Sequence, residues 1–105
     1  MYQATISQDR ARILLEQGAQ LVDVRPAHEF AHGALPGSVN IPLPDIQRAT
    51  KQLNKDTPVL LYCSSGQLSG TARQLLQAWG FHQVHNLGAR CDFVALKTDT
   101  KSGHQ

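Results

Sequence analysis

Residues 58–69, PVLLYCSSGQLS, decide the fold, because a continuous apolar run ends at a cysteine that small residues follow. The run at 58–62 shows no polar alternation, which predicts a strand buried on both faces of a parallel sheet. Residues 63–68 are typical of a loop, and Ser69 is expected to cap the helix that runs from there to Trp79. Cys63 should therefore lie where that loop begins, at the carboxyl end of the strand, where open parallel sheets bind ligands.

The rest of the chain alternates between helical and strand-like segments joined by short turns. Helices are expected from Ser7 to Gly18, from Pro26 to about Gly33, and from Pro44 through Leu53. Further strands are expected at 21–24, 38–41 and 83–86. This alternation predicts an α/β fold, with a parallel sheet covered by helices on both faces.

Length and composition set limits on function. The 105 residues suffice for one domain, which we assign to 1–97, and we expect 98–105 to be a polar, disordered tail. The net charge is only +2 and the basic residues are scattered, which argues against nucleic-acid binding. No apolar run approaches the ~20 residues of a membrane span, and no signal peptide is visible. We therefore expect a cytoplasmic monomer with no membrane partner, or a periplasmic protein if a leader has been removed.

The loop after the apolar run can favour a thiolate. Gly66 can adopt positive φ, and small Ser64 and Ser65 let backbone N–H groups turn inward near a helix N-terminus. Burial beside the apolar strand would favour the neutral thiol, but we expect the N–H groups to win and to lower the pKa of Cys63 below ~8.5. The thiolate is the nucleophilic form. A buried structural cysteine is the alternative interpretation.

Three motifs together resemble a known family. LVDVRPAHEF at 21–30, HGALPGSVNIP at 32–42 and CSSGQLS at 63–69 occur in the order and spacing of the single-domain rhodaneses, which are sulfurtransferases. The resemblance extends from about Thr5 to Phe93 and implies a parallel five-stranded sheet between helices. It implies that Cys63 takes a sulfane sulfur from thiosulfate or a persulfide donor and holds it as a persulfide. It also implies that a thiophilic acceptor then removes this sulfur, with cyanide as the acceptor in vitro and a thiol, such as a protein thiol, in cells. No cofactor is needed.

The resemblance also suggests roles for other residues. Backbone N–H groups of the loop would stabilise the persulfide, and the residues concerned are Ser64, Ser65, Gly66, Gln67, Leu68 and Ser69. Four polar residues upstream would support neighbouring loops rather than perform chemistry: Asp23, Arg25, Glu29, which could pair with Arg25, and His32.

Two departures from the family pattern stand out. Many rhodaneses carry an arginine in the loop, often at the fifth or sixth place, where this chain has Gln67 and Leu68. We therefore expect modest thiosulfate turnover, limited by weak donor binding, and we still expect persulfide formation. The Gly-Gly pair that usually follows the last strand reads Gly88-Ala89 here.

Cys91 is either a resolving thiol that accepts sulfur from Cys63 or an incidental cysteine. Arg90 is the basic residue nearest in sequence that could supply the missing cation. The histidines show no ligand spacing, so we expect no metal site.

Other cysteine chemistries fit poorly. A cysteine phosphatase needs an arginine six places after the cysteine, and that place is Ser69. A CxxC redox motif is absent from the loop. The remaining alternative to an enzyme is a rhodanese module for persulfide carriage, sensing or partner binding.

Overall fold

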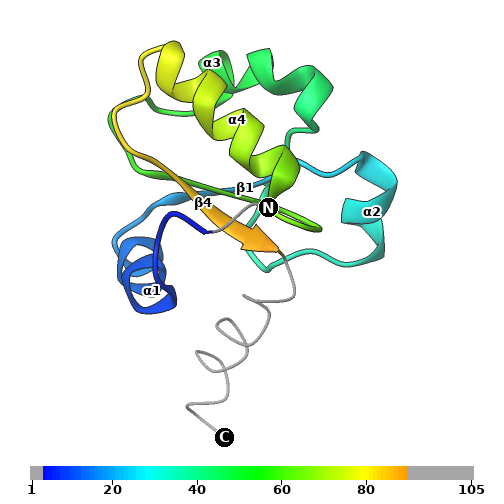
Figure 1. The fold of residues 1–105 in the computed structure, drawn as a ribbon, viewed down its shortest axis with the longest axis horizontal. Helices are drawn as coiled ribbons and strands as arrows, with labels where there is room; N and C mark the ends of the chain where they lie inside the picture. Colours follow the sequence, from blue (N-terminus) through cyan, green and yellow to red (C-terminus); the bar gives the residue numbers. More distant parts are fainter. Residues whose placement is uncertain (1–3, 90–105) are drawn as a thin grey trace, which may run out of the picture.

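The computed structural model describes residues 4–89, which form four parallel strands in the order β2-β1-β3-β4. The strands are β1 (Gln20–Asp23), β2 (Val39–Asn40), β3 (Val59–Cys63) and β4 (Val84–Ala89). The helices are α1 (Gln8–Glu16), α2 (Ala27–His32), the 3-10 helix η1 (Leu43–Arg48), α3 (Ala49–Gln52) and α4 (Gln67–Ala78). Helix α1 covers one face of the sheet, and α4 with α3 covers the other (Figure 1). The predicted α/β architecture is confirmed.

The expected fifth strand is not formed by residues 4–89. Thr5 lies along the outer edge of β4, where its N–H donates to the Asn86 carbonyl at 2.8 Å. Its Oγ1 accepts the N–H of Asn86 at 2.7 Å. The chain then enters α1 at once, because Ser7 caps that helix by accepting the N–H of Arg10. Within residues 4–89, Thr5 therefore makes two hydrogen bonds to the edge of β4 but does not continue as a strand.

Strand β3 divides the core in two. Its five residues are all buried, as the continuous apolar run predicted. Val59, Leu61 and Cys63 pack on the face of α4 and α3, whereas Leu60 and Tyr62 pack on the face of α1. The period-two alternation of a strand therefore points the Cys63 side chain toward α4.

The start of α4 differs from the prediction. The residue that caps the helix is Gly66, not Ser69, and Gly66 has φ +90° in the left-handed region that glycine adopts without strain. Ser69 lies in the first helical turn and is fully buried. The loop between β3 and α4 is correspondingly short, from Ser64 to Gly66.

The helix expected from Pro44 is also divided. Residues Leu43–Arg48 form η1 and Ala49–Gln52 form α3, with non-helical angles at Asp45. Ile46 and Ala49 are buried in the core on the same side of the sheet as α4.

A buried ion pair joins the end of β1 to the end of α2. Arg25 Nη2 lies 2.7 Å from Asp23 Oδ2, and the Arg25 side chain is only 8% exposed. Arg25 Nη2 also donates to the Gly33 carbonyl at 2.6 Å. The hydrogen bond to Asp23 is the main reason why the pKa of Arg25 is raised.

We predict that Asp23→Ala lowers the free energy of unfolding by about 3–5 kcal/mol, because it leaves a buried guanidinium without its counter-charge. Asp9→Ala is the matched control, since it breaks the exposed Asp9–Arg12 pair. That control should cost no more than about 1 kcal/mol. Urea unfolding of both variants measures the difference, and equal losses would contradict the structural role of the buried pair.

Candidate active site

Cys63 is the last residue of β3, and it is buried at 1% exposure. The sequence placed it at the carboxyl end of the strand, where the loop begins; it lies at that end, but as the last residue of the strand and not the first of the loop. The reason is β4, whose pairing with β3 continues past a register shift at Leu61 and Tyr62 to join Cys63 with Ala89. The thiol therefore lies in the protein interior, against the first turn of α4.

Three groups of the first turn and its cap reach the sulfur. The Gly66 N–H donates to Cys63 Sγ at 3.0 Å, and the Ser69 N–H donates at 3.5 Å. Ser69 Oγ lies 3.4 Å from the same sulfur. The Gln67 N–H turns away and donates to Ser65 Oγ at 3.3 Å. We call the groups that contact Sγ the cradle. They include the N–H groups of Gly66 and Ser69 but not that of Gln67.

These contacts set the charge of the thiol. Burial raises the pKa of Cys63, but hydrogen bonds from the Ser69 hydroxyl and from the N–H groups of Ser69, Ser65 and Gly66 lower it by more. The pKa of Cys63 is therefore below the ordinary value of a thiol. The start of α4 adds the positive end of a helix dipole at the same place.

Two glycines allow the close approach of the loop to β4. A Cβ on Gly66 would lie 3.1 Å from Gly88 Cα, too close for backbone that cannot move aside. Gly88 itself has φ +95°. Gly88 is therefore the member of the expected Gly-Gly pair that touches the loop, and Ala89 takes the other place at the end of β4.

Asn86, on β4, is a site residue that the sequence reasoning missed. Its side chain is 1% exposed, and its Nδ2 donates to the Gly66 carbonyl at 3.0 Å. Its Oδ1 accepts the Ser69 hydroxyl at 2.7 Å and the Gly88 N–H at 2.8 Å. The stretch VHNLGA carries polar residues at both His85 and Asn86, so the local sequence does not single out Asn86.

The predicted supports lie around this centre in different ways. Asp23 and Arg25 pair with each other at the end of β1. Glu29 accepts a hydrogen bond from Ser64 Oγ at 3.1 Å, so its hydrogen bond is to the loop and not to Arg25. His32 Nδ1 lies 2.8 Å from the His28 carbonyl, within α2.

Other expected features fall elsewhere. Cys91 and Arg90 lie outside the described residues. Between residues 4 and 89, no group of His, Cys, Asp or Glu side chains is arranged to hold a metal ion. No helix in that range is long and apolar enough to cross a membrane.

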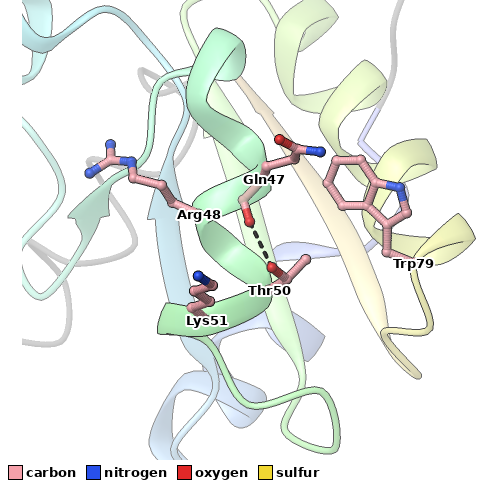
Figure 2. A pocket seen from close by; sticks show the side chains of 5 residues that line it. All are labelled: Gln47, Arg48, Thr50, Lys51 and Trp79. Carbon is pink, nitrogen blue, oxygen red and sulfur yellow. Dashed lines mark hydrogen bonds between the residues drawn. The ribbon is translucent and has the colours of Figure 1, made fainter.

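A hollow of about 450 Å³ lies at another place on the surface, lined by Gln47, Arg48, Thr50, Lys51 and Trp79 (Figure 2). Trp79 follows the carboxyl end of α4, whereas Cys63 lies at its amino end. A helix of 12 residues is about 18 Å long, so the hollow and the thiol are separate.

We predict that Cys63 titrates below ~8.5, the value of an unperturbed thiol. The rate of iodoacetamide alkylation against pH, measured in Cys91→Ser so that one thiol reports, gives the midpoint. A midpoint at or above the free-cysteine value would show that burial outweighs the hydrogen bonds.

Comparison with known proteins identifies the family. The rhodanese-like domain family matches residues 7–89. A Bacillus subtilis protein, YqhL, is 41% identical over 69 residues, which cover 66% of this chain and 55% of YqhL. The chain thus spans about half the length of that relative. The Escherichia coli thiosulfate sulfurtransferase PspE is 32% identical over 72% of this chain and 75% of its own. The Pseudomonas aeruginosa thiosulfate sulfurtransferase GlpE is 31% identical over 93% of this chain and 91% of its own.

Solved structures agree. A human single-domain sulfurtransferase superposes with a TM-score of 0.75 at 26% identity, over 87% of this chain and 95% of its own. A rhodanese from E. coli with bound anions gives a TM-score of 0.66 at 32% identity, over 71% of this chain and 91% of its own. Because the family model matches residues 7–89, which are most of the chain, the chain belongs to the rhodanese-like domain family.

Proposed function

We propose that the protein is a sulfurtransferase, and that Cys63 carries a sulfane sulfur from thiosulfate or a persulfide donor to a thiophilic acceptor. The observation that supports this most is the sulfur of Cys63 itself. It lies at the carboxyl end of a buried strand, with the N–H groups of Gly66 and Ser69 directed at it. Such an arrangement favours a negatively charged sulfur in a place where water is excluded.

The proposed reaction has two displacements at sulfur. The Cys63 thiolate attacks the outer sulfur of the donor, a new S–S bond forms, and the donor's remaining group departs with the electron pair of the broken bond. From thiosulfate that group is sulfite. A thiophilic acceptor, such as cyanide, a small thiol or a protein thiol, then attacks the terminal sulfur and returns Cys63 as the thiolate. One covalent intermediate shared by two half-reactions predicts ping-pong kinetics.

The charges around the loop favour one class of donor. Residues 64–69 contain no basic side chain, and the carboxylate of Glu29 is bonded to Ser64 at 3.1 Å. Arg25 is buried and neutralised by Asp23. Among the groups of residues 4–89 named here, a thiosulfate dianion meets a carboxylate and no unpaired cation. A persulfide donor of lower charge suits this part of the site better.

A persulfide-carrying module with no turnover of its own is the second candidate. Leu68, where relatives often have the loop arginine, is 37% exposed beside the cradle and offers an apolar contact to a protein partner. Multiple turnovers with a small acceptor would exclude this alternative.

We predict that Cys63→Ser folds but loses sulfur transfer completely, because a hydroxyl cannot hold the persulfide. Intact mass after incubation with thiosulfate should show a gain of one sulfur atom in the native protein, reversed by cyanide, and no gain in Cys63→Ser. Cys91→Ser is the matched control and should keep most of the activity. A sulfur gain that persists in Cys63→Ser and disappears in Cys91→Ser would overturn the assignment of the nucleophile.

We also predict that Gln67→Arg lowers the KM for thiosulfate about fivefold, since a cation near the bound dianion contributes roughly 1 kcal/mol in a hydrated site. Gln67 is exposed at the start of α4, so the change should not disturb folding. Gln74→Arg is the control, because it adds the same charge to an exposed position further along α4. An equal fall in KM in both variants would mean that net charge, not the loop position, captures the donor.

A further inference from the structure

The side chain of Asn86 has a fixed orientation. The Gly88 N–H can only donate, so the atom that faces it at 2.8 Å must be the oxygen Oδ1. The Gly66 carbonyl can only accept, so the atom that faces it at 3.0 Å must be the nitrogen Nδ2. Two backbone groups thus determine the amide orientation independently of each other.

This orientation also determines the direction of the Ser69 hydroxyl. Asn86 Oδ1 is an acceptor, so the single hydroxyl hydrogen of Ser69 points to it across 2.7 Å. Toward Cys63 Sγ, 3.4 Å away, Ser69 Oγ can then only accept. That arrangement fits a protonated thiol, whose S–H donates to Ser69.

The same arrangement does not fit a thiolate. Once the thiol loses its proton, a lone pair of Ser69 Oγ would face a negative sulfur. Rotation of the hydroxyl turns its hydrogen to Sγ and replaces this contact with a charge-assisted hydrogen bond. Asn86 Oδ1 is not left unsatisfied, because it keeps the N–H of Gly88.

We propose that Asn86 is a positioning residue for Cys63, which holds the hydrogen of the Ser69 hydroxyl while the thiol is protonated and releases it to Sγ when the thiolate forms. Cys63, Ser69 and Asn86 are each no more than 1% exposed. The second role of Asn86 is to hold the Gly66 carbonyl, and with it the peptide plane next to the one whose N–H reaches the sulfur. The proposal deepens the proposed function and rests on it, since it takes Cys63 as the nucleophile.

Charged groups on the surrounding elements do not take over the role of Ser69 and Asn86 at the sulfur. At the end of β1, Asp23 and Arg25, two residues further on, neutralise each other. Glu29 on α2 reaches the loop through Ser64, and its charge opposes a thiolate. On α4, Arg73 donates to the carbonyl of Val84. His85, next to Asn86 on β4, has a lowered pKa because of burial and of Arg73 and Arg10, which favours its neutral form.

The first test is Ser69→Ala, made in Cys91→Ser and read by the pH profile of iodoacetamide alkylation. We expect the midpoint to rise by about one pH unit, because the thiolate loses a charge-assisted donor. Thr71→Ala is the control, since it removes from the same helix an exposed hydroxyl that donates to the Gln67 carbonyl. An unchanged or lowered midpoint in Ser69→Ala would show that the hydroxyl stays on Asn86 in both states, and would overturn the proposal.

The second test couples Asn86 to Ser69. Asn86→Ala removes the competitor for the hydroxyl hydrogen but also loosens Gly66, and only the first effect requires Ser69. The shift in alkylation midpoint that Asn86→Ala causes is therefore measured in two backgrounds, one with Ser69 and one with Ser69→Ala. With Ser69 present, the shift should be more negative by at least about half a pH unit. Equal shifts in the two backgrounds would mean that Asn86 does not act through Ser69.

Asn86→Asp keeps the proposal testable if Asn86→Ala does not fold. A carboxylate holds the hydroxyl hydrogen of Ser69 more strongly than an amide does. The midpoint shift that Asn86→Asp causes should therefore be more positive with Ser69 present than in Ser69→Ala. The direct repulsion of the thiolate by this carboxylate is common to both backgrounds and cancels. Alkylation requires no sulfur donor, so a protein that transfers no sulfur but shows these shifts would refute the proposed function and leave the role of Asn86 intact.

Discussion

The structure depends on one constraint, which is that a buried sulfur can carry a negative charge only where hydrogen-bond donors already surround it. Burial alone raises the pKa of Cys63, and the hydrogen bonds from the start of α4 reverse that effect. Those donors converge because β3 ends at Cys63 and α4 begins at Gln67, with three residues between them. A turn this tight requires the positive φ of Gly66, so the electrostatics of the thiol rest on a backbone conformation.

Strand β4 completes the cradle from the other side. Gly88 leaves room for Gly66 to approach, and Asn86 bonds both the Gly66 carbonyl and the Ser69 hydroxyl. Thr5 in turn occupies the outer edge of β4 at Asn86, through that residue's own N–H and carbonyl. A chain of contacts therefore runs from the N-terminal segment to the sulfur, and the position of the Cys63 thiol depends on the edge of the sheet as well as on its own loop.

The sequence predicted what depends on local pattern. The apolar run at 58–62 predicted a strand buried on both faces, and Ser7 predicted the start of α1. The prediction that Ser69 caps α4 was wrong for a physical reason. Serine is a good cap when its oxygen accepts a helix N–H, but here tertiary contacts with Asn86 and Cys63 hold Ser69 inside the first turn. Asn86 had no local signature, since its partner Gly66 lies 20 residues earlier in the chain. The five-strand expectation came from the resemblance, whereas in residues 4–89 the segment at that edge is hydrogen-bonded to β4 through Thr5 and forms no strand.

Amide donors and charged side chains act over different ranges, and this chain relies on the first kind. Hydrogen bonds of 3.0 and 3.5 Å stabilise charge on Sγ itself. A cation at the loop would act over the Debye length of about 8–10 Å and would attract an anionic donor before contact. Within residues 4–89, Arg25 is paired with Asp23, and the carboxylate of Glu29 accepts a hydrogen bond from the loop. The described part of the site therefore stabilises negative charge on Sγ through hydrogen bonds at contact distance, and an attraction that acts on a donor before contact would need a charged side chain.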